Sequence, residues 1–224
     1  MTEDSFVNHL ISGHRSPAFM DGVGEGSMLG EIVACAIMLI DGVRINEVDD
    51  SKKLKHETIR YLAQILKRCT IFSFGIVSTQ ELNELKNIHK ADMLAMRRAV
   101  EGLPFKPDAV FVDGKYTVPG LTMPVYAVIK GDGKVYGIAA ASILAKDHRD
   151  RMISEKYGES CARYHVRSNH GYRSPDHLMA IKRWGITPYH RAWQWQVQRV
   201  LSGDYDEVIQ KKYRHRWEAL CQIE

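Results

Sequence analysis

The stretch Ala18-Phe-Met-Asp-Gly-Val-Gly-Glu-Gly26 passes from a short apolar segment into a loop rich in glycine. The chain continues with Gly30-Glu-Ile-Val-Ala-Cys-Ala-Ile-Met-Leu-Ile40, which is apolar almost throughout. An apolar run of this length predicts a strand buried on both faces, and the segment before the loop predicts a second strand. The stretch therefore predicts a domain built around a buried β-sheet.

Apolar periodicity predicts three more strands and a set of helices. The strands are expected at 70–78, 109–112 and 124–129. The helices are expected at 56–68, 79–103 with a break near residue 87, 136–156, 175–184, 189–201 and 204–220. Helical spacing is clearest in the first of these, where apolar residues recur at intervals of three and four.

The order of these elements predicts an α/β fold with a central five-stranded mixed sheet flanked by helices. Only helices are expected after the fifth strand, so the chain should end in a helical C-terminal cap. We expect a flexible leader at 1–16, the core at 17–160 and the helical region at 161–224.

The composition is that of an ordinary globular protein, with 45% hydrophobic and 26% charged residues. The net charge is +4, and residues 141–224 carry 15 Lys and Arg against 10 Asp and Glu. A basic C-terminal third favours contact with phosphate groups. On charge alone, a solvated surface explains it equally well.

The four cysteines are far apart and lack the C-x-x-C spacing of zinc and redox sites, which predicts reduced thiols. The longest apolar run, Ile32 to Ile40, has nine residues, whereas a membrane-spanning helix needs roughly 20. We therefore expect a cytoplasmic protein with no membrane partner, and we also expect a monomer.

Three aspartates, Asp21, Asp113 and Asp132, stand where predicted strands end. Converging carboxylates repel one another unless a cation neutralises them, and their oxygens are ligands that Mg²⁺ and Mn²⁺ prefer. Two such ions, about 3.5–4 Å apart, can activate water and stabilise the leaving oxygen of a phosphodiester. Asp-Gly after a strand is also typical of a simple turn, and spacing alone does not decide between the two.

Several further motifs occur in a fixed order. They are Asp50-Ser-Lys-Lys-Leu54, Phe111-Val-Asp-Gly114, Lys130-Gly-Asp132, Ile138-Ala-Ala-Ala-Ser-Ile-Leu-Ala-Lys146, Gly171-Tyr172, His177-Leu178 and His190-Arg191. Each alone is weak, since the apolar helix could be core and the lysine-containing segment a solvated loop. In this order and spacing they make the chain, from about residue 17 to about residue 200, resemble the ribonuclease HII (type 2 ribonuclease H) family.

The resemblance implies a ribonuclease H-like fold and an endonuclease that uses Mg²⁺ or Mn²⁺. The implied substrates are RNA–DNA hybrids and duplex DNA containing ribonucleotides, cut on the 5′ side of a ribonucleotide to leave a 3′-hydroxyl and a 5′-phosphate. It also implies that the helical C-terminal region completes the substrate groove. Asp21, Asp113 and Asp132 match three of the family's four catalytic, metal-binding acids.

Substrate contacts are implied by the same matching. Tyr172 matches a tyrosine that senses the deoxyribose beyond an RNA–DNA junction; the alternative is a surface tyrosine packed on Pro175. The main chain of the glycine-rich loop is implied to help read the ribose 2′-hydroxyl. The implied substrate-binding residues are Gly24, Glu25, Gly26, Asp50, Ser51, Lys52, Lys146 and Tyr172.

The first motif departs from the family pattern Asp-Glu-Ala/Val-Gly-Arg-Gly at two positions. Gly22 replaces the second acid and removes a carboxylate from the metal cluster. Glu25 replaces the arginine and puts a negative charge where phosphate is expected. Both changes predict impaired catalysis, unless Glu25 itself replaces the missing acid. Glutamate at position 22 with arginine at position 25 is predicted to raise cleavage by several orders of magnitude, mostly through the glutamate.

Other functions stay open. A protein with this fold could bind RNA–DNA hybrids without cutting them. An unrelated α/β phosphotransfer enzyme is disfavoured because no Walker loop occurs in the sequence. The related type HIII enzymes usually carry a further N-terminal domain, and only about 16 residues precede the core here, which favours type HII.

Overall fold

The computed structural model describes residues 3–204, 208–209 and 213–222, which form two compact units. Unit 1 comprises Met1–Val23, Ile32–Val77 and His89–Arg149, and unit 2 comprises Gly24–Glu31, Ser78–Ile88 and Asp150–Glu224. The expected division at residue 160 differs from this one, because two short segments of the N-terminal half belong to unit 2.

Unit 1 contains the five-stranded mixed sheet that the sequence predicts. Its strands are β1 (Ala18–Val23), β2 (Ile32–Leu39), β3 (Thr70–Val77), β4 (Val110–Asp113) and β5 (Val125–Val128), in the spatial order β3-β2-β1-β4-β5. The strands β1, β4 and β5 are parallel, and β2 is antiparallel to both of its neighbours.

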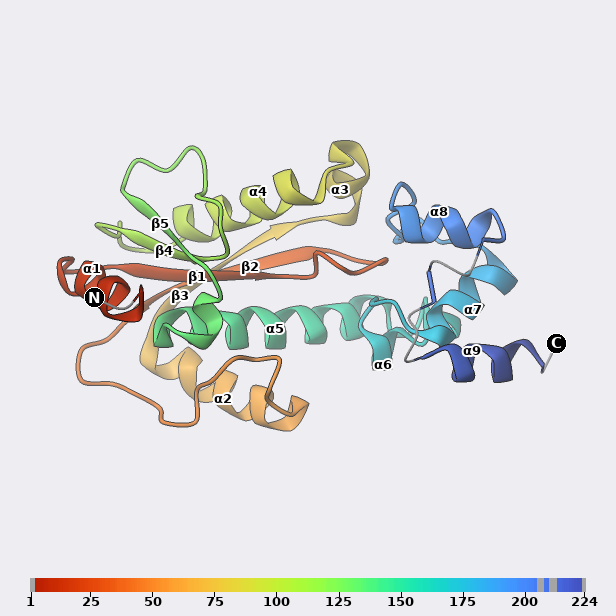
Figure 1. The fold of residues 1–224 in the computed structure, drawn as a ribbon, viewed down its shortest axis with the longest axis horizontal. Coiled ribbons are helices and arrows are strands. Elements are labelled where there is room, and N and C mark those ends of the chain that lie inside the picture. Colours follow the sequence, from red (N-terminus) through yellow and green to blue (C-terminus); the bar gives the residue numbers. More distant parts are fainter. Residues whose placement is uncertain (1–2, 205–207, 210–212, 223–224) are drawn as a thin grey trace. The chain divides into compact units, whose positions relative to one another are not determined.

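Helices cover both faces of this sheet (Figure 1). The helix α4 (Ile88–Glu101) lies on one face, while α2 (His56–Cys69) and the first part of α5 (Tyr136–Tyr157) lie on the other. A short 3₁₀ turn, η1 (Gly131–Gly133), connects the end of the sheet to α5.

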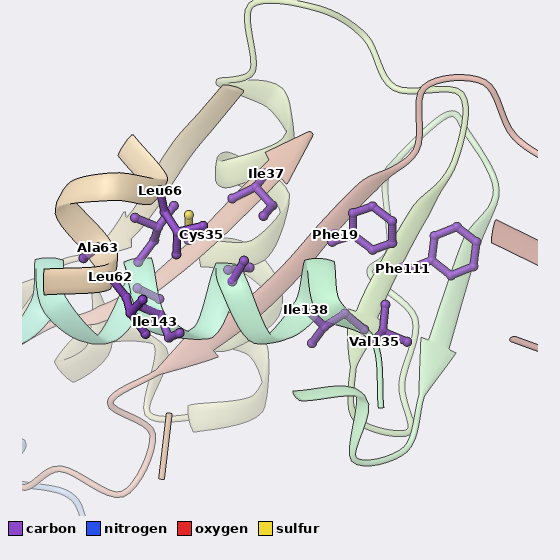
Figure 2. Packing of buried hydrophobic residues seen from close by; sticks show 14 of the residues in the cluster. Phe19, Cys35, Ile37, Leu62, Ala63, Leu66, Phe111, Val135, Ile138 and Ile143 are labelled. Carbon is purple, nitrogen blue, oxygen red and sulfur yellow. The ribbon is translucent and has the colours of Figure 1, made fainter. Parts of the chain in front are cut away.

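The core of unit 1 lies between the sheet and the helices α2 and α5 (Figure 2). Aromatic and aliphatic side chains of β1, β2 and β4 meet the apolar stripe of each helix there. They include Phe19, Cys35, Ile37, Phe111, Leu62, Leu66, Ile138 and Ile143. The helix α5 lies close to β1 because its second residue is Gly137, where a Cβ would overlap the ring of Phe19.

The N-terminal residues form a helix, α1 (Glu3–Ser12), where the sequence analysis expects a flexible leader. Val7, Leu10 and Ile11 recur at helical spacing and pack against the core of unit 1. In the sequence, the polar residues between these three mask a short amphipathic pattern.

Unit 2 is helical and has its own apolar core, which includes Met28, Leu29, Ile153, Tyr164, Leu178 and Val197. Its helices are α3 (Thr79–Leu85), α6 (Val166–Asn169), α7 (Pro175–Trp184), α8 (Trp195–Leu201) and α9 (Arg214–Cys221), with a 3₁₀ turn η2 (Ala162–Tyr164). The segment Gly24–Glu31 belongs here because its main chain pairs with that of residues 171 and 189–191. These hydrogen bonds bring it into unit 2.

Two C-terminal helices are shorter than predicted. The helix expected from residue 189 begins at Trp195, because residues 187–194 form turns whose amides donate within the loop and to Met28. The helix expected at 204–220 is described as α9, and residues 205–207 and 210–212 of that prediction lie outside the described residues. Among the described residues, no helix is both long enough and apolar enough to cross a membrane.

Close packing of α4 on β3 yields a first prediction. A Cβ at Gly75 would overlap the main chain of Ala95 and Ala99, so Gly75→Ala should lower the free energy of unfolding by about 2–3 kcal/mol. Urea unfolding measures the change. The control is Gly133→Ala, because a Cβ at Gly133 meets nothing within 4 Å. Equal stability of the two variants would contradict this packing.

Candidate active site

The alternation of side chains along β1 brings two of the predicted acids together. In the parallel pairing of β1 with β4, Phe19 lies opposite Phe111, and both face the core under α5. Side chains two residues apart on a strand share a face. Asp21 and Asp113 therefore follow the two phenylalanines on the same face, just beyond the apolar layer.

The third acid, Asp132, comes from η1, which follows β5. One carboxylate oxygen from each of Asp21, Asp113 and Asp132 lies within 4.8 Å of the other two. Asp21 and Asp132 are buried, and Asp113 is half-buried, with its Oδ1 accepting a hydrogen bond from the Gly131 amide at 2.7 Å. The three aspartates thus form one cluster of oxygen ligands at the end of the parallel strands.

The environment of Asp21 disfavours its negative charge. Burial raises the pKa of this carboxyl to about 7, and the charges of Asp113 and Asp132 act in the same direction. A hydrogen bond from the Ser142 hydroxyl, on α5, and another from the Gly22 amide at 2.8 Å partly oppose this. The cluster is therefore short of positive charge, and carboxylate oxygens in this arrangement fit Mg²⁺ or Mn²⁺.

Ser51 lies next to this network. Its hydroxyl is 2.9 Å from that of Ser142, and both residues are buried. Because Ser142 gives its hydrogen to Asp21, the Ser51 hydroxyl is the donor in this contact. The predicted substrate-binding residue Ser51 thus orients Ser142, which the sequence analysis did not single out.

The neighbouring predicted residues Asp50 and Lys52 form a turn that ends at the cluster. The Lys52 amide donates to Asp50 Oδ1 at 2.8 Å, and Lys52 Nζ donates to Asp132 Oδ2 at 2.6 Å. The Lys52 side chain is 74% exposed, and its bond to Asp132 raises its pKa. Lys52 is therefore a cation already in place beside the buried acids.

Lys146, also predicted to bind substrate, lies on α5 one helical turn after Ser142. It is half-buried and has interaction partners in the protein. Residues four positions apart share a helix face, so Lys146 lies on the side of α5 that carries Ser142.

In unit 2, Arg191 holds the glycine-rich loop. Its guanidinium is completely buried and donates to the carbonyl oxygens of Gly24, Glu25, Gly30 and Glu31, at 2.7, 3.2, 2.9 and 3.1 Å. The side chains of the loop are left outside this network, and Glu25 and Gly26 are exposed. Gly24 has a φ of 99°, a conformation that favours glycine. The buried guanidinium of Arg191 thus fixes the main chain of the loop that is predicted to contact the substrate ribose.

Tyr172 lies against the same loop. It forms an isolated β-bridge with Ser27, and the amide of Met28 donates to the Gly171 carbonyl at 2.9 Å. Tyr172 is half-buried. Within unit 2 the structure therefore brings together four of the predicted substrate-binding residues, Gly24, Glu25, Gly26 and Tyr172.

Two buried histidines support Tyr172 through a chain of hydrogen bonds. The Thr187 amide donates to His190 Nδ1 at 3.0 Å, so neutral His190 carries its proton on Nε2. His190 Nε2 lies 3.1 Å from His177 Nε2, and His177 Nδ1 lies 3.0 Å from the Tyr172 carbonyl. One set of protons satisfies all three contacts if both rings are neutral. Burial favours this state, lowering the pKa of His177 to about 4 and that of His190 to about 3.

Two polar residues near the predicted site had no role in the sequence analysis. The sequence places Ser142 only within an apolar helix, where a serine in a run of alanines is the available signal. Asp92, on α4, is buried and lies next to Gly22. An aspartate within the apolar stripe of a predicted helix was the available signal for it.

The raised pKa of Asp21 gives a second prediction. A carboxyl whose pKa is about 4 when unfolded and about 7 when folded makes the folded state bind more protons in this window, so stability falls as pH rises. Relative to Asp21→Asn, the metal-free parent should lose about 1.4 kcal/mol of unfolding free energy per pH unit between about pH 4 and pH 7. Urea unfolding in chelator measures both proteins.

Other titrating groups, including His177 and His190, are common to both proteins and largely cancel in the difference. A difference that does not vary with pH would show that Asp21 ionises as freely in the fold as in the unfolded chain.

Comparison with known proteins assigns this architecture to one family. The family model described as Ribonuclease HII matches residues 19–199. Ribonuclease HII of Myxococcus xanthus is 41% identical over 181 residues, covering 80% of this chain and 61% of that protein. Ribonuclease HII of Parabacteroides distasonis is 40% identical over 178 residues, covering 79% of this chain and 88% of that protein.

Among solved structures, a chain of the PCNA:RNase HII complex from Archaeoglobus fulgidus superposes with a TM-score of 0.67. The sequence identity is 25%, and the match covers 81% of this chain and 95% of that chain. The match to the family model over most of the chain and the two relatives at 40% identity or more agree with the fold described above. The chain belongs to the ribonuclease HII family.

Proposed function

We propose that this protein is a metal-dependent endonuclease that hydrolyses the RNA strand of RNA–DNA hybrids and cuts at single ribonucleotides in duplex DNA. The observation that carries the proposal is the cluster of Asp21, Asp113 and Asp132, whose oxygens lie within 4.8 Å of one another. Family membership supplies the class of reaction. The cofactor that fits these ligands is Mg²⁺ or Mn²⁺.

The three aspartates would hold the cofactor, and Ser142 orients Asp21 through its hydroxyl. Two bound cations would supply an activated water and a stabilised leaving oxygen. Besides its ion pair with Asp132, Lys52 has a proposed role in substrate binding. With a cation held by Asp132, the long, exposed Lys52 side chain would be available to bind a substrate phosphate through its ammonium group.

Recognition of the substrate is assigned to the loop Gly24–Gly26 and to Tyr172. Arg191 fixes the loop by bonding its carbonyl oxygens, which leaves the amides as the polar groups available to a ribose hydroxyl. The aromatic face of Tyr172 packs on the sugar beyond the junction, where a 2′-hydroxyl would be in the way. The Glu25 side chain is exposed and weakens phosphate binding by repulsion.

The second candidate function is a hybrid-binding protein without catalysis. Gly22 favours it, because the strand position next to Asp21 carries no carboxylate. The two candidates share the predicted substrate and differ in metal dependence, so one experiment separates them.

The test of function is cleavage of a duplex with one embedded ribonucleotide, with Mg²⁺ and Mn²⁺ in separate reactions. We expect a single cut on the 5′ side of the ribonucleotide. Asp113→Asn should slow cleavage by about three orders of magnitude, equivalent to about 4 kcal/mol of transition-state stabilisation. Asp49→Asn, at an exposed aspartate outside the cluster, should cleave at the parental rate. Binding of the duplex without cleavage in either metal would support the second candidate.

Tyr172 provides a separate prediction about specificity. Tyr172→Ala should slow cleavage at a single embedded ribonucleotide about tenfold, which corresponds to about 1.4 kcal/mol, relative to cleavage of a continuous hybrid. Tyr172→Phe keeps the aromatic face and should keep the parental ratio. The ratio of kcat/KM for the two substrates is the measurement. An unchanged ratio in Tyr172→Ala would assign the side chain to surface packing.

A further inference from the structure

Gly22 follows Asp21 on β1, and the space beside it is occupied by another acid. Because side chains alternate along a strand, a side chain at position 22 would point to the opposite face from Asp21, toward α4. A Cβ placed there would lie 2.5 Å from Asp92 Oδ1 and 3.3 Å from Met96 Cε. The carboxylate of Asp92 therefore fills the volume that the first atoms of a side chain at position 22 would need.

Asp92 stands in an apolar part of its helix. It is 3% exposed, and the other buried residues of α4 are Ala91, Ala95, Met96, Ala99 and Val100. Removing a carboxylate from water costs free energy that a small apolar residue would avoid. An acid at this position is thus unfavourable for packing alone, and it lies next to the one strand position where the family pattern has an acid and this chain has none.

The charge balance of a two-cation site also favours a fourth acid. Two divalent cations bring four positive charges, whereas Asp21, Asp113 and Asp132 bring three negative charges. A fourth carboxylate close to the site balances the two cations, and it need not bind directly because Mg²⁺ usually keeps several of its waters. Asp92 is not one of the three acids whose oxygens lie within 4.8 Å of one another. Because Asp92 lies on the α4 side of the strand, opposite the face of Asp21, its contact with a bound cation would run through hydration water.

We propose that Asp92 supplies from α4 the acidic group that Gly22 lacks, as an outer carboxylate that accepts a hydrogen bond from a cation's hydration shell. The inference rests on the proposed function, since it assigns one more residue to the same metal site. Glycine at position 22 and aspartate at position 92 then form a matched pair, because the carboxylate of Asp92 occupies the space of any larger residue at position 22.

This pairing revises an expectation from the sequence. From the sequence, Gly22→Glu alone is predicted to recover most of the missing catalysis by restoring a carboxylate. The structure shows that Asp92 occupies that space, so the glutamate would displace it and bring two carboxylates into contact. Gly22→Glu alone should therefore destabilise the fold without raising cleavage. The gain should require Asp92→Ala in the same chain.

The test uses Mn²⁺ titration by calorimetry, without substrate, together with cleavage of the ribonucleotide-containing duplex. Asp92→Asn keeps the shape and removes the charge, so we expect at least a tenfold weaker Mn²⁺ affinity and slower cleavage. Glu101→Gln, at an exposed acid on the same helix, should match the parent in both. Gly22→Glu combined with Asp92→Ala should regain the Mn²⁺ affinity and the cleavage that Asp92→Ala alone loses.

Two results would overturn the inference. One is Asp92→Asn with parental Mn²⁺ affinity and cleavage; the other is a double variant no better than Asp92→Ala, which would mean that Asp92 only packs. Asp113→Asn separates this failure from failure of the proposed function. If Asp113→Asn loses Mn²⁺ binding and cleavage while Asp92→Asn does not, only the role of Asp92 is rejected. A parent that neither binds Mn²⁺ nor cleaves rejects both.

Discussion

The period-two alternation of side chains along β1 is the constraint on which unit 1 depends. Register with β4 puts Phe19 opposite Phe111 in the core, and the next residues on that face are Asp21 and Asp113. A slip of one residue would turn Asp21 toward α4 and a core phenylalanine away from α5. The packing that stabilises the sheet and the convergence of the acids are therefore set by the same register.

The same arrangement has an energetic cost. The acids lie directly beyond a layer of apolar side chains, and burial raises the pKa of Asp21 to about 7. Ser142 and Lys52 offset part of the cost, the first by a hydrogen bond and the second by its charge. A divalent cation would bind most favourably where little positive charge in the protein already neutralises the buried carboxylates. The core of unit 1 supplies the stability that allows such a cluster to persist.

In unit 2, buried polar side chains fix a main chain of irregular conformation. The loop Gly24–Glu31 makes few regular backbone hydrogen bonds, so its carbonyl oxygens need other donors. Arg191 supplies them from complete burial, and the neutral pair His177 and His190 supports the Tyr172 carbonyl. The polar groups that hold the loop are thus hidden, while Glu25 is exposed and its side chain lies outside this scaffold.

The sequence by itself determined the five-stranded mixed sheet, most of its helices and the three acids at the sheet, because these follow from local periodicity and from motifs in fixed order. The helix α1 and the division into units do not follow from the sequence, because three apolar residues are too few to stand out and the units depend on hydrogen bonds between distant segments.

Only the tertiary structure decided the contacts of Ser142, Arg191 and Asp92. Each contacts a partner at least 70 positions away in the sequence, and residue spacing along the chain does not predict contacts between such distant segments. Gly22 shows the physical reason most clearly. In the sequence Gly22 is a missing carboxylate, whereas in the fold the space beside it is filled by Asp92, an acid on the helix α4.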